Sequence, residues 1–251
     1  MNFKSACIVT VGSEITRGLI QDTNSNWIAN KLTSHGVLVK RIISVPDEKE
    51  EIKWALRSCL EIAELVVTTG GLGFTHDDIT VEAVADALGL KLVLSIEALN
   101  MIKSRVRGEV TYQVKAAYIP EGSRPLYNRV GVSPGVHIVV GSKSIFLLPG
   151  VPGEMKAIFE DYVEPLVSQS GVYSRTIIVK TRHTYESQVD RLLEPLRSKY
   201  TWAYFKTHAK TPVEITVIVR ANSLLELEER VNALIIDLRR TLEVQSVETI
   251  F

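Results

Sequence analysis

Short apolar runs and longer stretches of helical periodicity alternate along the first part of the chain. Three apolar runs predict β-strands: ACIVTV at 6–11, VLVKRIIS at 37–44 and LVVTT at 65–69. The polar and apolar positions that follow these runs predict helices near 26–36, 47–63 and 78–89. Because strands alternate with helices, the pattern predicts βαβ units and a mainly parallel sheet covered by helices on both faces.

The pattern changes after residue 120. The segment GVHIVVGSKSIFLLPG, residues 135–150, predicts two strands joined by a short turn at 141–143, so part of the sheet should be antiparallel. A helix opened by proline and glycine is predicted at 151–167. These elements together predict a three-layer α/β/α sandwich with a mainly parallel sheet.

The end of the chain predicts a second domain. Small polar residues at 168–174 indicate a linker, and we place the domains at 1–170 and 171–251. The second domain has a predicted helix at 185–199, an alternating strand at 213–221 and a last helix that begins at a capping box of Ser223 and Glu226. It reads as a small α/β domain without obvious chemistry of its own.

Charge and cysteine content narrow the functional classes. Lys plus Arg and Asp plus Glu both number 29, so no net field favours nucleic acid or an anionic membrane as a partner. Cys7 and Cys59 lie at apolar positions, which predicts buried thiols in a reducing compartment, without a disulfide and without a cysteine metal site. No apolar segment approaches the roughly 20 residues of a membrane helix, and the amino terminus has no signal-peptide pattern. These features predict a cytoplasmic protein.

The glycine-rich stretch LVVTTGGLGFTHDDIT, residues 65–80, is the first candidate site. Backbone amides of a glycine turn at a strand end, next to a helix start, suit a phosphate. Asp77 and Asp78 would repel a bare phosphate, so a divalent cation with oxygen ligands, most simply Mg²⁺, is expected between them. The alternative is a tight turn in which Asp77 or Asp78 only caps the helix.

Three further turns are predicted at the same edge of the sheet, because ligands of α/β sheets bind outside the carboxyl ends of the strands. Asp47 follows the second strand, the polar loop GSEITRGLIQDTNSN follows the first, and LLPGVPGEM follows the strand near 145. Each has a structural alternative: a helix cap, a solvated loop and a stiff connection. No dinucleotide fingerprint, Walker A motif, zinc spacing or serine-nucleophile elbow occurs in the sequence.

Taken in order, four segments resemble the amino-terminal domain of the CinA (competence-damage-inducible) family: GSEITRGLIQDTNSNWIANKL, VPDEKEEI, TTGGLGFTHDDITVEAVADALG and LPGVPGEMKAIFEDYV. That domain belongs to a molybdopterin-binding-like superfamily that includes MogA and MoaB. The resemblance covers residues 5–167, and TYESQVDRLLEPL with VEITVIVRA resembles the small α/β domain that follows in CinA proteins. It does not extend to the carboxy-terminal deamidase domain of longer CinA proteins, so nicotinamide mononucleotide deamidation is not expected.

The resemblance implies a fold and an activity. It implies the three-layer α/β fold and metal-dependent cleavage of the pyrophosphate in ADP-ribose or a related nucleotide such as FAD. Asp78 and Asp47 match aspartates of the superfamily and are the expected catalytic residues. The sequence departs from the family pattern at Phe74, where proline is usual, and at Ser13, where a carboxylate or amide is usual.

We therefore expect a metal-dependent nucleotide pyrophosphatase that acts as a homo-oligomer on a small nucleotide or pterin ligand. The alternatives are a molybdopterin-binding or adenylyl-transferring protein and a non-catalytic binding module. The expected metal ligands are Asp47, Asp77 and Asp78, with Mg²⁺ as the metal and Mn²⁺ or Co²⁺ as substitutes. The expected phosphate- and nucleotide-binding residues are Glu14, Asp22, Asn24, Ser25, Thr69, Gly70, Gly71, Leu72, Gly73, Thr75, Pro149, Gly150, Val151, Pro152, Gly153 and Glu154.

Overall fold

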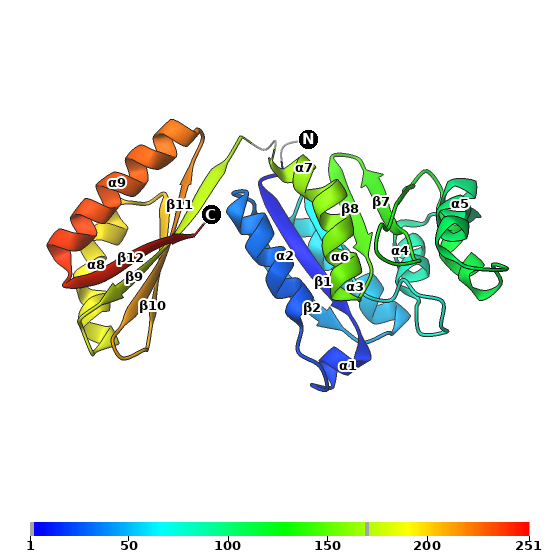
Figure 1. The fold of residues 1–251 in the computed structure, drawn as a ribbon, viewed down its shortest axis with the longest axis horizontal. Coiled ribbons are helices and arrows are strands. Elements are labelled where there is room, and N and C mark those ends of the chain that lie inside the picture. The colour runs from blue at the N-terminus through cyan, green and yellow to red at the C-terminus, as the bar shows by residue number, and fades with distance from the viewer. Residues whose placement is uncertain (1–2, 169–170, 251) are drawn as a thin grey trace. The chain divides into compact units, whose positions relative to one another are not determined.

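A computed structural model describes residues 3–168 and 171–250 (Figure 1). The described chain divides into two compact units, one formed by residues 3–32 and 37–168 and the other by residues 33–36 and 171–250. Within these ranges no helix is both long enough and apolar enough to cross a membrane.

The first unit is built on a six-stranded sheet with the order β2-β1-β3-β8-β7-β6. The first four strands in that order run parallel, and β7 and β6 are antiparallel to their neighbours. The prediction of a mainly parallel sheet with an antiparallel part is therefore confirmed. The strands are β1 Ser5–Val11, β2 Leu38–Val45, β3 Leu65–Thr69, β6 Arg124–Leu126, β7 Gly135–Val140 and β8 Lys143–Leu148.

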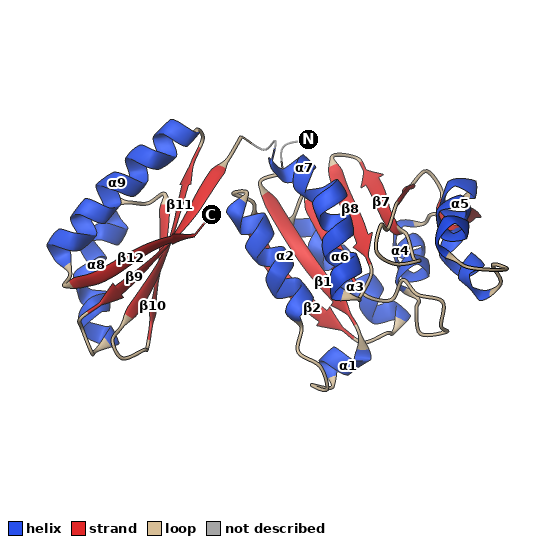
Figure 2. Cartoon of the chain, viewed as in Figure 1, coloured by secondary structure: helices blue, strands red, loops and turns tan. Residues whose placement is uncertain are grey.

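Helices cover both faces of this sheet because alternate strand residues point to opposite sides. Cys7 and Val9 of β1 pack in one buried cluster with residues of α3 and α4. Ala6 and Ile8 pack in another with residues of α2, α6 and η2 (Figure 2). The three-layer α/β/α prediction is thus confirmed. The helices of this unit are α1 Ser13–Thr16, α2 Thr23–Ser34, α3 Lys49–Ile62, α4 Thr80–Leu88, α5 Ile96–Arg105, α6 Pro152–Ile158 and α7 Glu164–Val167, with the π-helix η2 at Phe159–Val163.

A small substructure between α4 and β6 has no counterpart in the prediction. It contains the two-stranded antiparallel sheet of β4 (Leu92–Leu94) and β5 (Tyr118–Pro120), together with α5 and the 3₁₀ helix η1 (Tyr112–Ala117). Each strand has only three residues, too few for a period of two to stand out in the sequence.

The second unit has the element order βαββαβ and a four-stranded antiparallel sheet in the order β10-β11-β9-β12. This is the arrangement of ferredoxin-like folds. The predicted helices and the central strand are present. The predicted linker at 168–174 is wrong at Tyr173 and Ser174, which open β9, and its positions 169 and 170 lie outside the described residues. The elements are β9 Tyr173–Thr181, α8 Glu186–Lys199, β10 Ala203–His208, β11 Glu214–Ala221, α9 Leu224–Thr241 and β12 Val244–Ile250.

The expected absence of a disulfide is wrong. Cys7 of β1 and Cys59 of α3 form a disulfide, with their Cα atoms 5.5 Å apart. Both residues are fully buried in the core between α3 and the sheet. Packing of the helix on the strand brings together two cysteines separated by 52 positions, and nothing in the local sequence around either of them carries that information.

Candidate functional site

The carboxyl ends of four parallel strands lie level at one edge of the first unit's sheet. Val11 of β1 is opposite Val45 of β2, while Thr10 is opposite Thr69 of β3, and Thr69 is opposite Leu148 of β8. The four segments that follow these strands therefore leave the sheet at the same edge. They are the four turns that the sequence predicted to meet.

The four turns enclose a cavity of about 510 Å³. This volume lies within the range of about 300–1,000 Å³ found for small-molecule sites. The lining residues come from all four turns and from the loop before β7: Thr10, Val11, Gly12, Glu14, Ile15, Asn24, Asp47, Thr69, Gly70, Gly71, Leu72, Gly73, Phe74, Asp77, Asp78, Ser133, Pro149, Gly150, Val151 and Glu154.

The turn after β3 depends on glycine at two positions. Gly70 and Gly71 have φ values of +105° and +68°, which disfavour any residue with a side chain. A Cβ atom at Gly70 would collide with the Val11 carbonyl oxygen, and one at Gly71 would collide with the Thr80 hydroxyl. The turn therefore packs directly on β1 and on the start of α4.

Among the lining residues, the backbone amides of Gly71, Leu72, Gly150 and Val151 have no acceptor within the described part of the chain. By contrast, the Gly70 amide donates to the Leu148 carbonyl at 3.0 Å and the Gly73 amide donates to Asp78. Only part of the predicted Gly70 to Gly73 cradle is thus available to a ligand, and the turn after β8 supplies two further amides. Backbone amides normally have a partner, so an anionic ligand is well suited to this wall.

Asp78 holds the glycine turn closed. One carboxylate oxygen accepts from the Gly73 amide at 2.8 Å, and the other accepts from the Thr75 amide at 2.8 Å and the Thr75 hydroxyl at 2.6 Å. Asp78 does not cap α4, since the N-cap is Ile79 and has no side-chain hydrogen bond. The neighbouring Asp77 is 66% exposed and contacts only His76 among the described side chains, at 2.8 Å.

Asp47 fixes the turn after β1. Its carboxylate accepts from the Ser13 amide at 2.7 Å, and its own amide donates to the Ser13 hydroxyl at 3.2 Å. The cap of α3 is instead Glu48, without a side-chain hydrogen bond. Ser13 thus supplies a hydroxyl acceptor that ties the turn after β1 to the turn after β2.

The cavity floor is tied together by Asn24. Its amide nitrogen donates to the Thr69 hydroxyl at 3.0 Å and to the Gly150 carbonyl at 2.8 Å, and the Thr69 hydroxyl donates to the Pro149 carbonyl at 2.8 Å. Since a carbonyl can only accept, this network fixes the orientation of the Asn24 amide. Asn24 therefore joins the amino end of α2 to the ends of β3 and β8.

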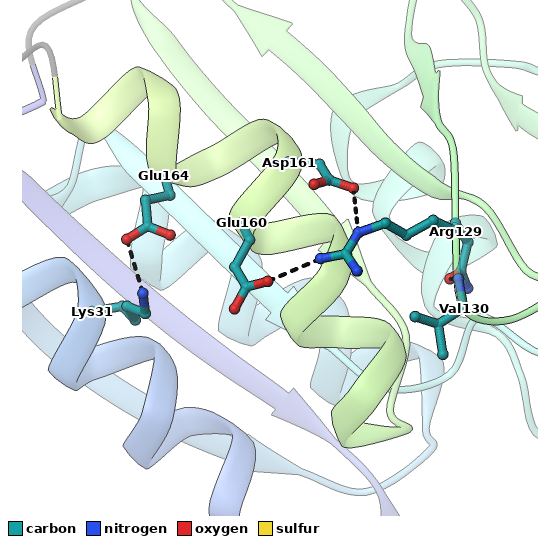
Figure 3. A network of polar contacts seen from close by, with 7 residues as sticks. Lys31, Arg129, Val130, Glu160, Asp161 and Glu164 are labelled. Atoms are coloured by element: carbon teal, nitrogen blue, oxygen red, sulfur yellow. Dashed lines mark hydrogen bonds and ion pairs between the residues drawn. The ribbon is translucent and has the colours of Figure 1, made fainter.

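Glu154 meets the loop that precedes β7. It accepts from the Asn128 amide nitrogen at 2.6 Å, while the Asn128 oxygen accepts from the amides of Val130 and Gly131. Arg129 in the same loop donates to Glu160 at 3.0 Å and to Asp161 at 2.9 Å (Figure 3). The π-helix η2, which carries both acids, thus anchors the loop that places Ser133 at the cavity.

The structure places some predicted site residues behind the cavity wall. Asp22 accepts from the Thr10 hydroxyl at 2.8 Å and from the Ser25 amide at 2.9 Å, so both residues organise the start of α2. Thr75, Pro152 and Gly153 do not line the cavity either. The prediction missed Ser133, for which the sequence offers no signal, and Thr10 to Gly12, which the strand-end rule could have supplied.

The cavity lining carries five carboxylates, those of Glu14, Asp47, Asp77, Asp78 and Glu154, and no lysine, arginine or histidine. No group of three or more His, Cys, Asp or Glu side chains among the described residues is arranged to hold a metal ion. The donor set nevertheless fits Mg²⁺, which commonly takes one or two carboxylates and completes its shell with water and ligand phosphates.

Comparison with known proteins places this geometry in a family. The family model described as "Probable molybdopterin binding domain" matches residues 7–169. A relative from Caldivirga maquilingensis is 41% identical over 237 residues, covering 90% of this chain and 92% of the relative. Protein Ta0487 of Thermoplasma acidophilum is 37% identical over 230 residues, covering 90% and 86%.

A solved structure agrees with these matches. The crystal structure of the protein CinA from Thermoplasma acidophilum, whose function is given as unknown, is 44% identical with a TM-score of 0.63. It covers 65% of this chain and 99% of its own. The chain therefore belongs to the molybdopterin-binding domain family and is similar to CinA.

Proposed function

We propose that the first unit is a metal-dependent hydrolase that cleaves the pyrophosphate of ADP-ribose or of a related nucleotide such as FAD and releases AMP. The observation that carries this proposal is the composition of the cavity wall. The unpaired backbone amides of Gly71, Leu72, Gly150 and Val151 can donate hydrogen bonds to an anion, but five carboxylates without a basic side chain would repel it. A diphosphate bound together with a divalent cation would suit both sets of groups, because its oxygens accept from the amides and the cation offsets the charge of the carboxylates.

In this proposal the backbone amides bind the diphosphate and the carboxylates bind the cation. The amides of Gly71, Leu72, Gly150 and Val151 would bind phosphate oxygens, which orients the scissile bond. Asp77 and Asp47 would hold the cation, because Asp77 contacts only His76 and Asp47 accepts only from the Ser13 amide among the described residues, which leaves carboxylate lone pairs available. When bound, the cation would neutralise charge on the diphosphate and lower the pKa of a coordinated water. Asp78 would act chiefly by keeping the glycine turn closed.

A second candidate is molybdopterin binding or adenylyl transfer, which the family match favours. Both reactions would use the same cradle for a phosphate beside a fused heterocycle. We place hydrolysis first because the sequence resembles CinA over four ordered segments and because a similar structure is that of a CinA protein.

The test is chromatographic detection of AMP after incubation with ADP-ribose, or FAD, and Mg²⁺, Mn²⁺ or Co²⁺. Asp77→Asn is the informative variant, since its carboxylate accepts from no backbone amide among the described residues. Asp78→Asn should instead lower both activity and thermal stability. Glu121→Gln, an exposed acid that lines neither described cavity, is the matched control.

We expect the unmodified protein to release AMP only when the metal is present. Asp77→Asn should lower the rate of AMP release at saturating substrate, and a higher metal concentration should restore part of that rate. No AMP from either nucleotide in a folded protein would contradict the hydrolase proposal. AMP transfer that requires ATP and a pterin would establish the second candidate, and ligand-dependent stabilisation without turnover would indicate a binding module.

A further inference from the structure

A second cavity of about 200 Å³ adjoins the other side of the glycine turn. Gly71, Leu72, Gly73 and Asp78 line both cavities, so the turn forms a wall between them. The remaining lining comes from the start of α4 and from the small substructure before β6: Val81, Glu82, Leu92, Lys115, Ala116 and Tyr118.

The wall opposite the turn is largely apolar. In the antiparallel pair of β4 and β5, Leu94 is opposite Tyr118 and Leu92 is opposite Pro120, so Leu92 and Tyr118 lie on the same face. Val81 and Ala116 supply further aliphatic surface. Such a surface suits a flat ring, and the Tyr118 ring is available for stacking because the residue is 44% exposed.

Lys115 gives this cavity a basic side chain, which the lining of the main cavity lacks. It is the only basic residue among those that line either cavity. Its ammonium group donates to the carbonyl of Thr75, in the turn that Asp78 closes. An ammonium group has three donors, so Lys115 can also donate to an acceptor on a ligand while it holds the turn.

We propose that the second cavity is the subsite for the adenine ring of the nucleotide, with Tyr118 stacking on the ring and Lys115 donating to a ring nitrogen. The assignment rests on the proposed function, because ADP-ribose and FAD both contain adenine as part of the adenosine diphosphate that they share. The cavity is smaller than the usual range for a whole ligand, about 300–1,000 Å³, and therefore suits one ring. The diphosphate would then cross the amides of Gly71 and Leu72 into the main cavity, where polar groups suit the second ribose.

The test is calorimetric titration of the full chain with AMP and with ribose 5-phosphate, both in the presence of Mg²⁺. Leu92→Trp should fill the second cavity, and Tyr118→Ala should remove the stacking surface. Val93→Trp is the matched control, since it adds the same ring at the next residue, on the opposite face of β4, and the two positions are 37% and 38% exposed. Melting temperatures check that each variant is folded.

We expect Leu92→Trp and Tyr118→Ala to weaken AMP binding by about tenfold, as loss of base stacking would. Ribose 5-phosphate binding should be unchanged in both, and Val93→Trp should bind both ligands like the unmodified protein. Three results would overturn the subsite. The first is an unchanged AMP affinity in Leu92→Trp, the second is an equal loss of affinity for AMP and ribose 5-phosphate, and the third is no AMP binding by the unmodified protein. The expected AMP pattern without hydrolysis of ADP-ribose would retain the subsite and refute the hydrolase proposal.

Discussion

In the first unit four parallel strands end level with one another, whereas in the second unit every neighbouring pair of strands is antiparallel. Parallel strands send their following segments out at one edge, and the main cavity lies there, with the second cavity on the other side of the glycine turn. Antiparallel strands distribute their connections between two opposite ends. Both units consist of helices packed on a sheet, but the parallel strands of the first unit bring its polar turns together, whereas the antiparallel strands of the second unit keep its turns apart.

The polar residues of the second unit serve its own elements. Ser223 caps α9 by accepting from the Glu226 amide at 3.1 Å, as the capping-box pattern predicts. The Thr181 hydroxyl donates to the Val213 carbonyl at 2.8 Å. In the first unit Asp22 and Asp78 likewise hold turns, but they do so around a cavity wall in which backbone amides remain unpaired. The direction of neighbouring strands therefore decides whether such turns come together to form a site.

We expect the largest effect from removal of the disulfide, which should lower the stability of the first unit and leave that of the second unchanged. The double variant Cys7→Ala/Cys59→Ala should lower the free energy of unfolding of the first unit by about 4 kcal/mol, the chain-entropy value for a loop of this length. The second unit contains no cysteine and should keep its unfolding midpoint. Urea titrations in a Trp202→Phe background would follow the first unit through Trp27 and Trp54. An unchanged midpoint would show that the disulfide contributes nothing there.

A matched pair of glycine substitutions should affect activity next. Gly71→Val places a side chain at φ +68° against the Thr80 hydroxyl and should reduce AMP release about 100-fold, because a small misplacement of the cradle misorients the ligand. Gly171→Val in the second unit has the same φ of +68° but meets no atom within 4 Å. It should cost stability without changing AMP release. Equal activity losses would contradict the assignment of the cradle.

Removal of one arginine from each unit should have a smaller effect. Arg129→Ala releases the loop of Ser133 from Glu160 and Asp161 and should raise the KM for ADP-ribose a few-fold with little change in kcat (Figure 3). Because these ion pairs are exposed, the free energy of unfolding should fall by no more than about 1 kcal/mol. Arg197→Ala, which breaks an exposed pair with Asp190 in the second unit, should leave KM unchanged.

The smallest expected effect is the pH dependence that His137 gives the first unit. Burial, and secondarily the charge of Arg124, lower the pKa of His137, which stacks on Phe146. A lowered folded pKa means that the unfolded state takes up a proton first, so stability is complete above pH 6.5 and declines as the pH falls below it. His137→Gln should reduce this decline. A decline of the same size in both proteins, measured by urea titration, would contradict this role.

Much of the fold and part of the site could be predicted from local sequence. Alternating apolar runs and helical stretches identify β1 to β3, α3, α4 and the β7–β8 hairpin, since periodicity directly reflects which side chains are buried. Glycines at φ +105° and +68° in the turn after β3 were foreseeable, because only glycine adopts such angles without strain. The strands β4 and β5 have three residues each, too few to show a period of two in the sequence. Because the second cavity is lined in part by these strands, it could not be predicted either.

Local sequence is enough to identify the order of strands and helices, the four polar turns and the family to which the chain belongs. Three features emerge only once the chain has folded: the disulfide between Cys7 and Cys59, the three hydrogen bonds by which Asp78 closes a turn, and the place of Ser133 in the cavity lining. The tertiary structure also decides which amides stay unpaired. The physical reason is that secondary structure follows local periodicity, whereas a site and a disulfide depend on contacts between residues far apart in the chain, which packing of helices on a parallel sheet creates.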